Sequence, residues 1–314
     1  MPPILNFRSV GDLNLTILKN LHKFPHDVDL IVGLPRSGML PANLLALYLN
    51  KPYTDIDSFV DGRIYGCGNR GKLIESSILK KILIIDDSVS SGNALNIAKK
   101  KIAELQKSYS FIFSAIYAQR DSLSKVDIFC EIVEQPRCFQ WNLFHHPLVL
   151  KNSFLDIDGV LCPNPPLDDD GLKYLAYLNS APKLYIPSVE VDTLVSCRLE
   201  KYRGATEDWL KRNGVKYKKL VLLNLPSKKD RLVWGRHGEF KGKIYRKSNA
   251  TLFVESSLHE AKKIFKIAKK PVFCIETFSM LNVCDTRHKV EIWSECIKKI
   301  VWRILTKMNI LKKD

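Results

Sequence analysis

The 314-residue chain lacks the patterns that would place it in a membrane or outside the cell. No stretch reaches the roughly 18 uninterrupted apolar residues that a membrane-spanning helix needs. Its first ten residues, MPPILNFRSV, lack the basic and apolar segments of a signal peptide. The eight cysteines are scattered without a C-x-x-C pair, so neither a metal knuckle nor a disulfide framework is visible. We therefore expect a cytoplasmic protein with reduced thiols.

Two common nucleotide-binding fingerprints are missing from the Asp/Ser/Gly segment at 82–94. This segment has neither G-x-x-x-x-G-K-[ST] nor G-x-G-x-x-G, so neither a Walker site nor a Rossmann dinucleotide site fits there. Acidic residues are few, with 33 Asp and Glu against 49 Lys and Arg, giving a net charge of +16. This excess predicts an anionic partner: nucleic acid, a phosphorylated metabolite or an anionic membrane. Because the basic residues are spread along the chain and are densest at its C-terminus, we expect no nucleic-acid groove.

The order of the remaining sequence predicts an α/β protein. Apolar strand-like runs at 29–32, 81–85 and 111–117 alternate with helix-like segments at 40–49 and 93–105. This alternation is typical of parallel sheets flanked by helices. The same pattern restarts near Ser153, and the chain is long enough for two domains. We therefore predict two domains, each with a largely parallel sheet, at 1–148 and 149–286, followed by a C-terminal helix at 287–314.

The first candidate site lies in residues 82–94, which read ILIIDDSVSSGNA. An apolar strand ends in Asp86 and Asp87, and a short Ser/Gly loop then opens a helix. Backbone N–H groups at such a turn, together with the positive end of the helix, suit a phosphate. The two carboxylates beside them suit ribose hydroxyl groups.

This pattern resembles the motif of type I phosphoribosyltransferases that binds phosphoribosyl pyrophosphate (PRPP). The resemblance implies a phosphoribosyltransferase fold in which Asp86 and Asp87 hold the ribose hydroxyls, directly or through a metal. It also implies that the 5-phosphate is cradled by the loop, Ser88, Val89, Ser90, Ser91 and Gly92. The family usually has Thr before the glycine, whereas Ser91 keeps only the hydroxyl here.

Two further segments resemble parts of the same family. Residues 32–38, VGLPRSG, are similar to its pyrophosphate loop, which implies that Arg36 and Ser37 contact pyrophosphate. Residues 61–72 are similar to its flexible loop over PRPP, with four glycines and three basic residues. These basic residues are Arg63, Arg70 and Lys72. Two other interpretations stay open: acids after a strand often cap a helix, and a Gly/Arg loop is often only a solvated turn.

The second candidate site lies in residues 154–161, FLDIDGVL. Residues two apart on a strand face the same way, so we expect Asp156 and Asp158 to point together off the strand end. Such a pair can bind Mg²⁺ through oxygen, while one carboxylate attacks phosphorus and the other handles the leaving-group proton. A turn or a calcium-like loop is the alternative interpretation of D-x-D-G.

This motif resembles the first motif of haloacid-dehalogenase-type phosphatases, whose Rossmann-like fold we therefore expect for this domain. The resemblance implies that Asp156 is the nucleophile and Asp158 the general acid/base. Later segments resemble the other motifs and imply that Ser196 binds the transferring phosphoryl group and that Lys241, or alternatively Lys243, neutralises charge. Glu255 stands alone where the family has two aspartates, and with Asp156 and Asp158 it completes the implied Mg²⁺ ligands. Whether this single carboxylate lowers metal affinity stays open.

Taken together, residues 1–280 resemble the fused phosphoribosyltransferase–phosphatases of bacterial polysaccharide gene clusters. The resemblance implies a bifunctional, Mg²⁺-dependent enzyme that transfers 5-phosphoribosyl from PRPP to a glycan, free or lipid-linked. It then removes the 5-phosphate to leave a β-ribofuranosyl residue. Alternatives are a nucleobase-salvage phosphoribosyltransferase with an attached phosphatase and a non-catalytic PRPP-sensing regulator that binds nucleic acid. The acceptor sugar, its linkage and the oligomeric state stay open.

The C-terminal segment is a basic, amphipathic helix in our prediction. Its apolar residues recur at spacings of three and four and so form one stripe: Ile292, Trp293, Ile297, Ile300, Val301, Ile304, Leu305 and Met308. Such a helix either lies in an anionic membrane interface, which would make the protein peripheral at the inner membrane face, or docks on the protein itself.

Overall fold

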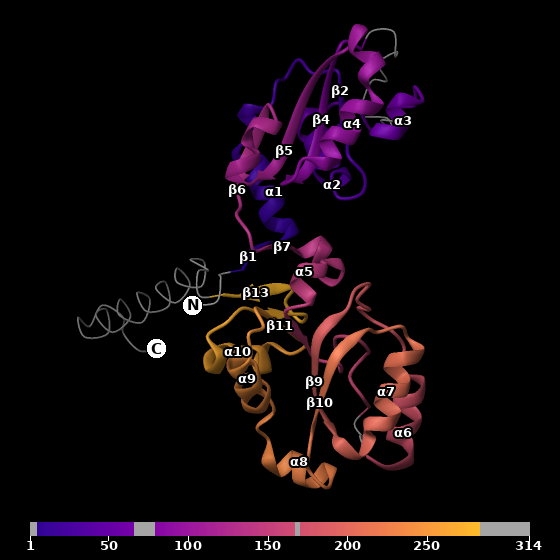
Figure 1. Ribbon diagram of the computed structural model, residues 1–314, viewed down its shortest axis with the longest axis vertical. Coiled ribbons are helices and arrows are strands. Elements are labelled where there is room, and N and C mark those ends of the chain that lie inside the picture. The colour runs from indigo at the N-terminus through magenta and orange to yellow at the C-terminus, as the bar shows by residue number, and fades with distance from the viewer. Residues whose placement is uncertain (1–4, 66–78, 167–169, 283–314) are drawn as a thin grey trace, which may run out of the picture. The chain divides into compact units, whose positions relative to one another are not determined.

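The computed structural model describes residues 5–65, 79–166 and 170–282 (Figure 1). The chain divides into two units that meet in the sequence between Leu143 and Phe144. Arg70, Lys72 and the expected C-terminal helix lie outside the described residues. Within the described part, no helix is long and apolar enough to cross a membrane.

The N-terminal unit is built on a five-stranded parallel sheet in the order β3-β2-β4-β5-β6. Its strands are β2 (Leu30–Gly33), β3 (Tyr53–Asp55), β4 (Lys81–Val89), β5 (Ser110–Ala118) and β6 (Ile128–Ile132). A separate parallel pair joins β1 (Asn6–Arg8) to β7 (Arg137–Phe139). The helices are α1 (Val10–Lys19), α2 (Met39–Leu49), α3 (Ile56–Val60) and α4 (Asn93–Lys101). Short 3₁₀ segments are η1 (Leu21–Lys23), η3 (Ala103–Lys107), η4 (Arg120–Lys125) and η5 (Gln140–His145).

Helices cover both faces of this sheet, which explains the unbroken apolar run in β4. Successive side chains of a strand point to opposite faces. Leu83 and Ile85 accordingly enter the core formed with α1 and α2, while Ile82 and Ile84 enter the core formed with α3 and α4. A strand buried on both faces needs apolar side chains at every position.

The C-terminal unit contains a six-stranded sheet in the order β10-β9-β8-β11-β12-β13, parallel except for its last strand. Its strands are β8 (Ser153–Leu155), β9 (Val191–Leu199), β10 (Tyr217–Leu223), β11 (Leu252–Glu255), β12 (Val272–Cys274) and β13 (Ser279–Leu281). The helices are α5 (Pro147–Leu150), α6 (Gly171–Ser180), α7 (Arg203–Arg212), α8 (Lys228–Trp234), α9 (His237–Lys247) and α10 (Leu258–Ala268), and η6 (Glu200–Tyr202) precedes α7. In Figure 1, α9 lies beside α10 and α6 beside α7. The expected α/β class, with largely parallel sheets flanked by helices, is confirmed.

Both sheets reverse their winding direction near the middle. In the N-terminal unit the chain runs from β2 outward to β3 and later from β4 outward to β6. In the C-terminal unit it runs from β8 to β10 and later from β11 to β13. The crevice at the carboxyl ends of the strands flanking such a reversal is where open α/β sheets bind their ligands.

Candidate functional site

The acidic pair of the N-terminal unit lies within β4, directly after Ile85, which pairs with Gly33 at the carboxyl end of β2. The strand continues to Val89, beyond the end at residue 85 that the sequence predicted. Asp86 and Asp87 are both buried, and the Asp87 N–H donates to Oδ1 of Asp86 at 2.8 Å. Burial, reinforced by the neighbouring Asp87 charge, raises the pKa of Asp86 to about 8. The pair therefore keeps a proton at neutral pH, so it can donate as well as accept hydrogen bonds.

Trp141 is a neighbour of this pair that the sequence did not suggest. Its indole N–H donates to Oδ2 of Asp87 at 2.6 Å, across 54 residues of sequence. The ring stacks on Phe139 with centroids 5.0 Å apart, and Phe139 in turn stacks on Tyr117 at 5.2 Å. This aromatic column fixes the donor and hence the orientation of the Asp87 carboxylate.

The predicted pyrophosphate loop passes close to the same strand end. A Cβ at Gly38 would lie 2.5 Å from the Leu34 carbonyl oxygen and 2.9 Å from Oδ1 of Asp86, so only glycine fits. The peptide bond between Pro35 and Arg36 is cis. Arg36 is exposed, and its Nη2 donates to Oδ1 of Asn142 at 2.6 Å. The predicted loop and the acidic pair are therefore brought together. Ser37 lies in this loop and is half-buried.

The Ser/Gly loop leads from β4 into α4. Gly92, at the N-cap of α4, has φ +79°, a conformation that glycine adopts without strain. Within the described part of the chain, the backbone N–H groups of Ser91 and Gly92 have no hydrogen-bond partner. Arg137, a second residue that the sequence did not suggest, donates to the Ser88 hydroxyl at 3.4 Å and to the Val89 carbonyl at 3.3 Å. The loop thus presents free donors at the positive end of a helix.

Of the three basic residues of the predicted lid, only Arg63 lies within the described residues. It is exposed and pairs with Asp61 at 2.8 Å. This pairing on the surface neither supports nor opposes a role over the site.

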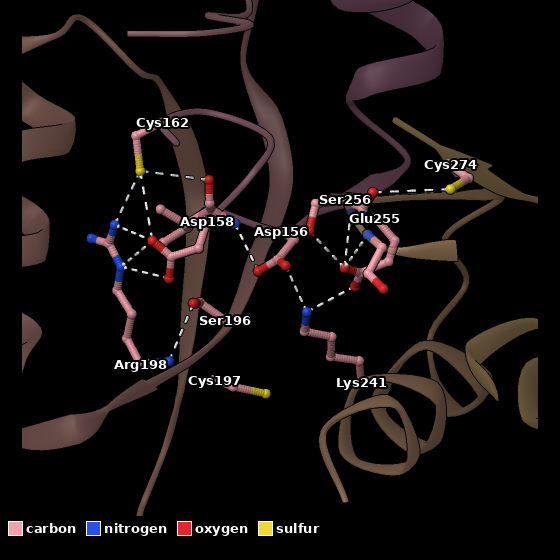
Figure 2. A network of polar contacts seen from close by, with 12 residues as sticks. Asp156, Asp158, Cys162, Ser196, Cys197, Arg198, Lys241, Glu255, Ser256 and Cys274 are labelled. Carbon is pink, nitrogen blue, oxygen red and sulfur yellow. Dashed lines mark hydrogen bonds and ion pairs between the residues drawn. The ribbon is translucent and has the colours of Figure 1, made fainter. Parts of the chain in front are cut away.

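The second candidate site lies where the C-terminal sheet reverses. Asp156 directly follows β8, and Glu255 ends the adjacent strand β11. Figure 2 shows the Lys241 ammonium between the two carboxylates. Its Nζ lies 2.6 Å from Oδ2 of Asp156 and 2.8 Å from Oε2 of Glu255. The exposed fractions of the three side chains are only 6%, 1% and 5% for Asp156, Glu255 and Lys241.

The electrostatics of this cluster favour a proton on Asp156. Burial raises the pKa of Asp156 to about 8; Lys241 opposes this rise and Glu255 reinforces it. Burial also opposes the charge on Lys241, but Asp156 and Glu255 outweigh it and raise the pKa of Lys241. One ammonium therefore serves two carboxylates, and the cluster lacks positive charge.

Asp158 faces a different partner from Asp156, contrary to the expectation that the two carboxylates point together (Figure 2). β8 ends at Leu155, so neither aspartate lies on a regular strand: Asp156 directly follows β8, and Asp158 forms an isolated bridge with Cys162. Arg198 binds Asp158 with Nη2 to Oδ1 at 2.7 Å and Nε to Oδ2 at 3.0 Å. Burial opposes the charge on Arg198, but Asp158 outweighs it and raises the guanidinium pKa.

The remaining predicted residues are placed by β9 and α9. Ser196, buried on β9, accepts a hydrogen bond from the Arg198 backbone N–H at 3.2 Å. Lys243 is exposed and lies 3.7 Å from Glu239, away from the carboxylates. Of the two candidate lysines, the structure therefore brings Lys241 to the site.

The donor set suits a magnesium ion only in part. Among the described residues, no three His, Cys, Asp or Glu side chains form a group that could hold a metal. Mg²⁺, however, usually binds through one or two carboxylates plus phosphate and water. Asp156 and Glu255 meet that requirement, since both offer oxygen and their cluster lacks positive charge. Asp158 is engaged by Arg198 and does not share this position.

Comparisons with known proteins give matches among solved structures only. No protein-family model matches the chain, and no curated protein sequence matches it. The chain is similar to the xanthine-guanine-hypoxanthine phosphoribosyltransferase of Helicobacter pylori, with 19% identity over 44% of this chain and 92% of that one and a TM-score of 0.33. It is similar to a purine phosphoribosyltransferase of Pyrococcus horikoshii, with 18% identity over 43% of this chain and 92% of that one and a TM-score of 0.30. It is also similar to the orotate phosphoribosyltransferase of Aeropyrum pernix, with 13% identity over 39% of this chain and 70% of that one and a TM-score of 0.28.

Proposed function

We propose that the N-terminal unit transfers the 5-phosphoribosyl group of PRPP to a glycan acceptor and that the C-terminal unit then removes the 5-phosphate. The observation that carries this proposal is the position of the acids: each sheet has them at the crevice where its winding reverses. In the first unit the acids precede a loop in which two backbone N–H groups have no partner among the described residues, and in the second they surround a buried ammonium.

In the transfer step the protein mainly has to bind the charged groups of PRPP in the right places, and none of its side chains has to form a covalent bond. Pyrophosphate is a good leaving group, so the site has to hold its two ends and position the acceptor at C1. The N–H groups of Ser91 and Gly92 suit the 5-phosphate. The Asp86–Asp87 pair suits the ribose hydroxyls because it both donates and accepts. Arg36 is free to contact pyrophosphate once it leaves Asn142.

The hydrolysis step requires a nucleophile and a proton donor. The ionised form of Asp156, which Lys241 favours, forms a bond from its oxygen to phosphorus while the bond from phosphorus to the ribose O5 breaks. Asp158, once it leaves Arg198 and in its protonated form, supplies the proton to O5. Water then attacks the phosphoryl–aspartate, gives its proton to Asp158 and frees Asp156 and inorganic phosphate. Ser196 and Lys241 hold the phosphoryl oxygens. Asp156 and Glu255 would hold Mg²⁺, which would supply further positive charge there.

The two steps fit one another chemically. The transferase product carries a phosphomonoester at C5, and an aspartate-based phosphatase hydrolyses this class of bond. A lipid-linked acceptor would bring the protein to a membrane, and the predicted C-terminal helix would then have a surface to bind. This contact stays a prediction, because the helix lies outside the described residues.

Mass spectrometry of glycans incubated with PRPP and Mg²⁺ tests the proposal. The wild-type protein is expected to add a ribosyl group, and Asp156→Asn to add a phosphoribosyl group that keeps its phosphate. Replacing Asp86 and Asp87 by asparagine is expected to abolish transfer while sparing hydrolysis of a phosphoribosylated glycan. Asp208→Asn, at an exposed position on α7, is the matched control.

Three outcomes would contradict this assignment. Asp156→Asn could give the fully dephosphorylated product at the wild-type rate. The double variant could consume PRPP undiminished. Transfer to a free nucleobase without transfer to any glycan would favour the salvage enzyme instead.

A further inference from the structure

Lys125 lies behind the Ser/Gly loop and is held there by two hydrogen bonds. It ends η4, far from the loop in sequence, and its Nζ donates to the Ser90 carbonyl at 2.9 Å and to the Ser91 carbonyl at 3.0 Å. Its stem runs past Gly92, where an added Cβ would lie 2.8 Å from Cδ of the lysine. The ammonium and the stem thus both rest on the same loop.

This contact fixes the direction of two backbone N–H groups. In a trans peptide the carbonyl and the following N–H point in opposite directions. Both peptides concerned are trans, because the described chain has cis bonds only before Arg36 and Pro136. Drawing the carbonyls of Ser90 and Ser91 toward Lys125 therefore turns the N–H groups of Ser91 and Gly92 away from it. These are the two N–H groups that have no partner among the described residues.

Other contacts hold the same loop without covering those N–H groups. Arg137 holds the Val89 carbonyl, and the Ser90 hydroxyl is bonded to the Gln119 side chain. Lys125 forms no ion pair with any carboxylate of the described residues. Its charge is therefore not neutralised locally, and it adds to the positive potential at the start of α4.

We propose that Lys125 is a positioning residue of the phosphate cradle: it holds the carbonyls of Ser90 and Ser91 on one side so that the N–H groups of Ser91 and Gly92 face a phosphate on the other. This inference rests on the proposed function of the loop. It assigns Lys125 to the 5-phosphate end of PRPP and gives it no part at the pyrophosphate end.

Three variants separate this role from a general effect of charge. Lys125→Met keeps an apolar stem beside Gly92 and removes the donor, whereas Lys125→Arg keeps a donor and the charge. Lys107→Met removes a positive charge from an exposed position of η3 and serves as the control. Equal thermal unfolding of the variants and the wild type would show that they are folded.

The first measurement is a titration with inorganic phosphate, followed by the amide NMR shifts of Ser91 and Gly92. Lys125→Met is expected to weaken phosphate binding about tenfold, a loss of about 1.4 kcal/mol. Lys125→Arg is expected to restore most of the affinity, and Lys107→Met to match the wild type. Unchanged affinity in Lys125→Met would overturn the inference.

The second measurement is calorimetry with ribose 5-phosphate and with pyrophosphate, taken separately. Lys125→Met is expected to weaken the first ligand and spare the second, with a raised KM for PRPP and a nearly unchanged kcat. Equal weakening of both ligands would show a general charge effect and overturn the inference. If phosphate shifts the Ser91 and Gly92 amides in a Lys125-dependent way but PRPP is never consumed, the inference stands and the proposed transfer fails.

Discussion

Lys241 is the one cation of the described residues that is bonded to the buried carboxylates of Asp156 and Glu255, so its removal tests how the C-terminal unit tolerates these charges. Methionine at this position keeps most of the apolar stem and deletes the ammonium. Removing one partner from a buried ion pair costs about 3–5 kcal/mol, because the remaining charge is left without compensation. Two carboxylates lose their partner here, but Asp156 can take up a proton, which limits the loss. We expect Lys241→Met to lower the free energy of unfolding by about 4 kcal/mol near pH 8.

The loss is expected to depend on pH in a definite direction. Without Lys241, burial favours the neutral form of Asp156 even more strongly than in the wild type, where its pKa is already about 8. In the unfolded chain this carboxyl group ionises near its ordinary pKa of about 4. Between these limits the folded variant binds more protons than the unfolded one, so its stability falls as pH rises. The difference from the wild type should be largest at pH 8 and smallest below pH 5.

The matched control lies two residues further along α9. Lys243→Met removes an exposed ammonium 3.7 Å from Glu239 and is expected to change stability by less than about 0.5 kcal/mol. Adding Glu255→Gln to Lys241→Met should recover part of the loss, because one of the two unpaired charges disappears. Urea denaturation read by hydrogen exchange of β8 and β11 peptides would follow the C-terminal unit separately. A loss in Lys241→Met no larger than in Lys243→Met, or independent of pH, would refute the reasoning.

Two further predictions concern buried polar groups elsewhere. The wild-type N-terminal unit should lose stability as pH rises from 3.8 to about 8, because folded Asp86 holds a proton that the unfolded chain releases. In thermal melts, Asp86→Asn should reduce this dependence of stability on pH. An equal dependence in the variant and the wild type would contradict the prediction. The ammonium of Lys270 donates to three backbone carbonyls, those of Tyr245, Ser248 and Ala250, at 2.9, 2.7 and 3.1 Å. Lys270→Met should therefore cost about 3 kcal/mol in urea denaturation, against no measurable cost for exposed Lys266→Met, and similar midpoints would disprove this.

The sequence was sufficient to predict those structural features that depend on neighbouring residues. The apolar run at 82–85 predicts a strand because its composition requires burial, and β4 continues from it through the two acids to Val89. Glycine at position 38 and the Ser/Gly loop could likewise be recognised locally. Each of these features depends on residues within a few positions of one another.

Contacts across long stretches of chain could not be predicted in this way. Trp141 lies 54 residues from Asp87, and Arg198 lies 40 residues from Asp158. Their pairing depends on the order of strands in each sheet, which no local pattern states. The expectation that Asp156 and Asp158 share one direction was wrong because β8 ends before both of them, so strand alternation no longer applies.

The choice between Lys241 and Lys243 shows the limit of a motif in another way. Residues two apart on an α-helix point to nearly opposite sides, so only one of these lysines can reach the carboxylates. The resemblance favours Lys241 and leaves Lys243 as the alternative, and which one faces β8 and β11 depends on how α9 packs against the sheet. In the fold, α9 packs beside α10 and buries Lys241 together with Gly242 and Tyr245.

The two acidic sites share one electrostatic property and differ in another, and the difference bears on their proposed chemistry. Asp86 and Asp156 both have pKa values raised to about 8, so each site has more buried carboxylate than compensating charge and favours an added cation. In the first unit, cations such as Arg137 and Lys125 hold the backbone of a loop whose free N–H groups suit a phosphate. That phosphate would serve only to bind and position the substrate, and no nucleophile would attack it. In the second unit the ammonium of Lys241 touches Asp156 itself, so a phosphate drawn to this cation would meet a carboxylate oxygen, as attack on phosphorus requires.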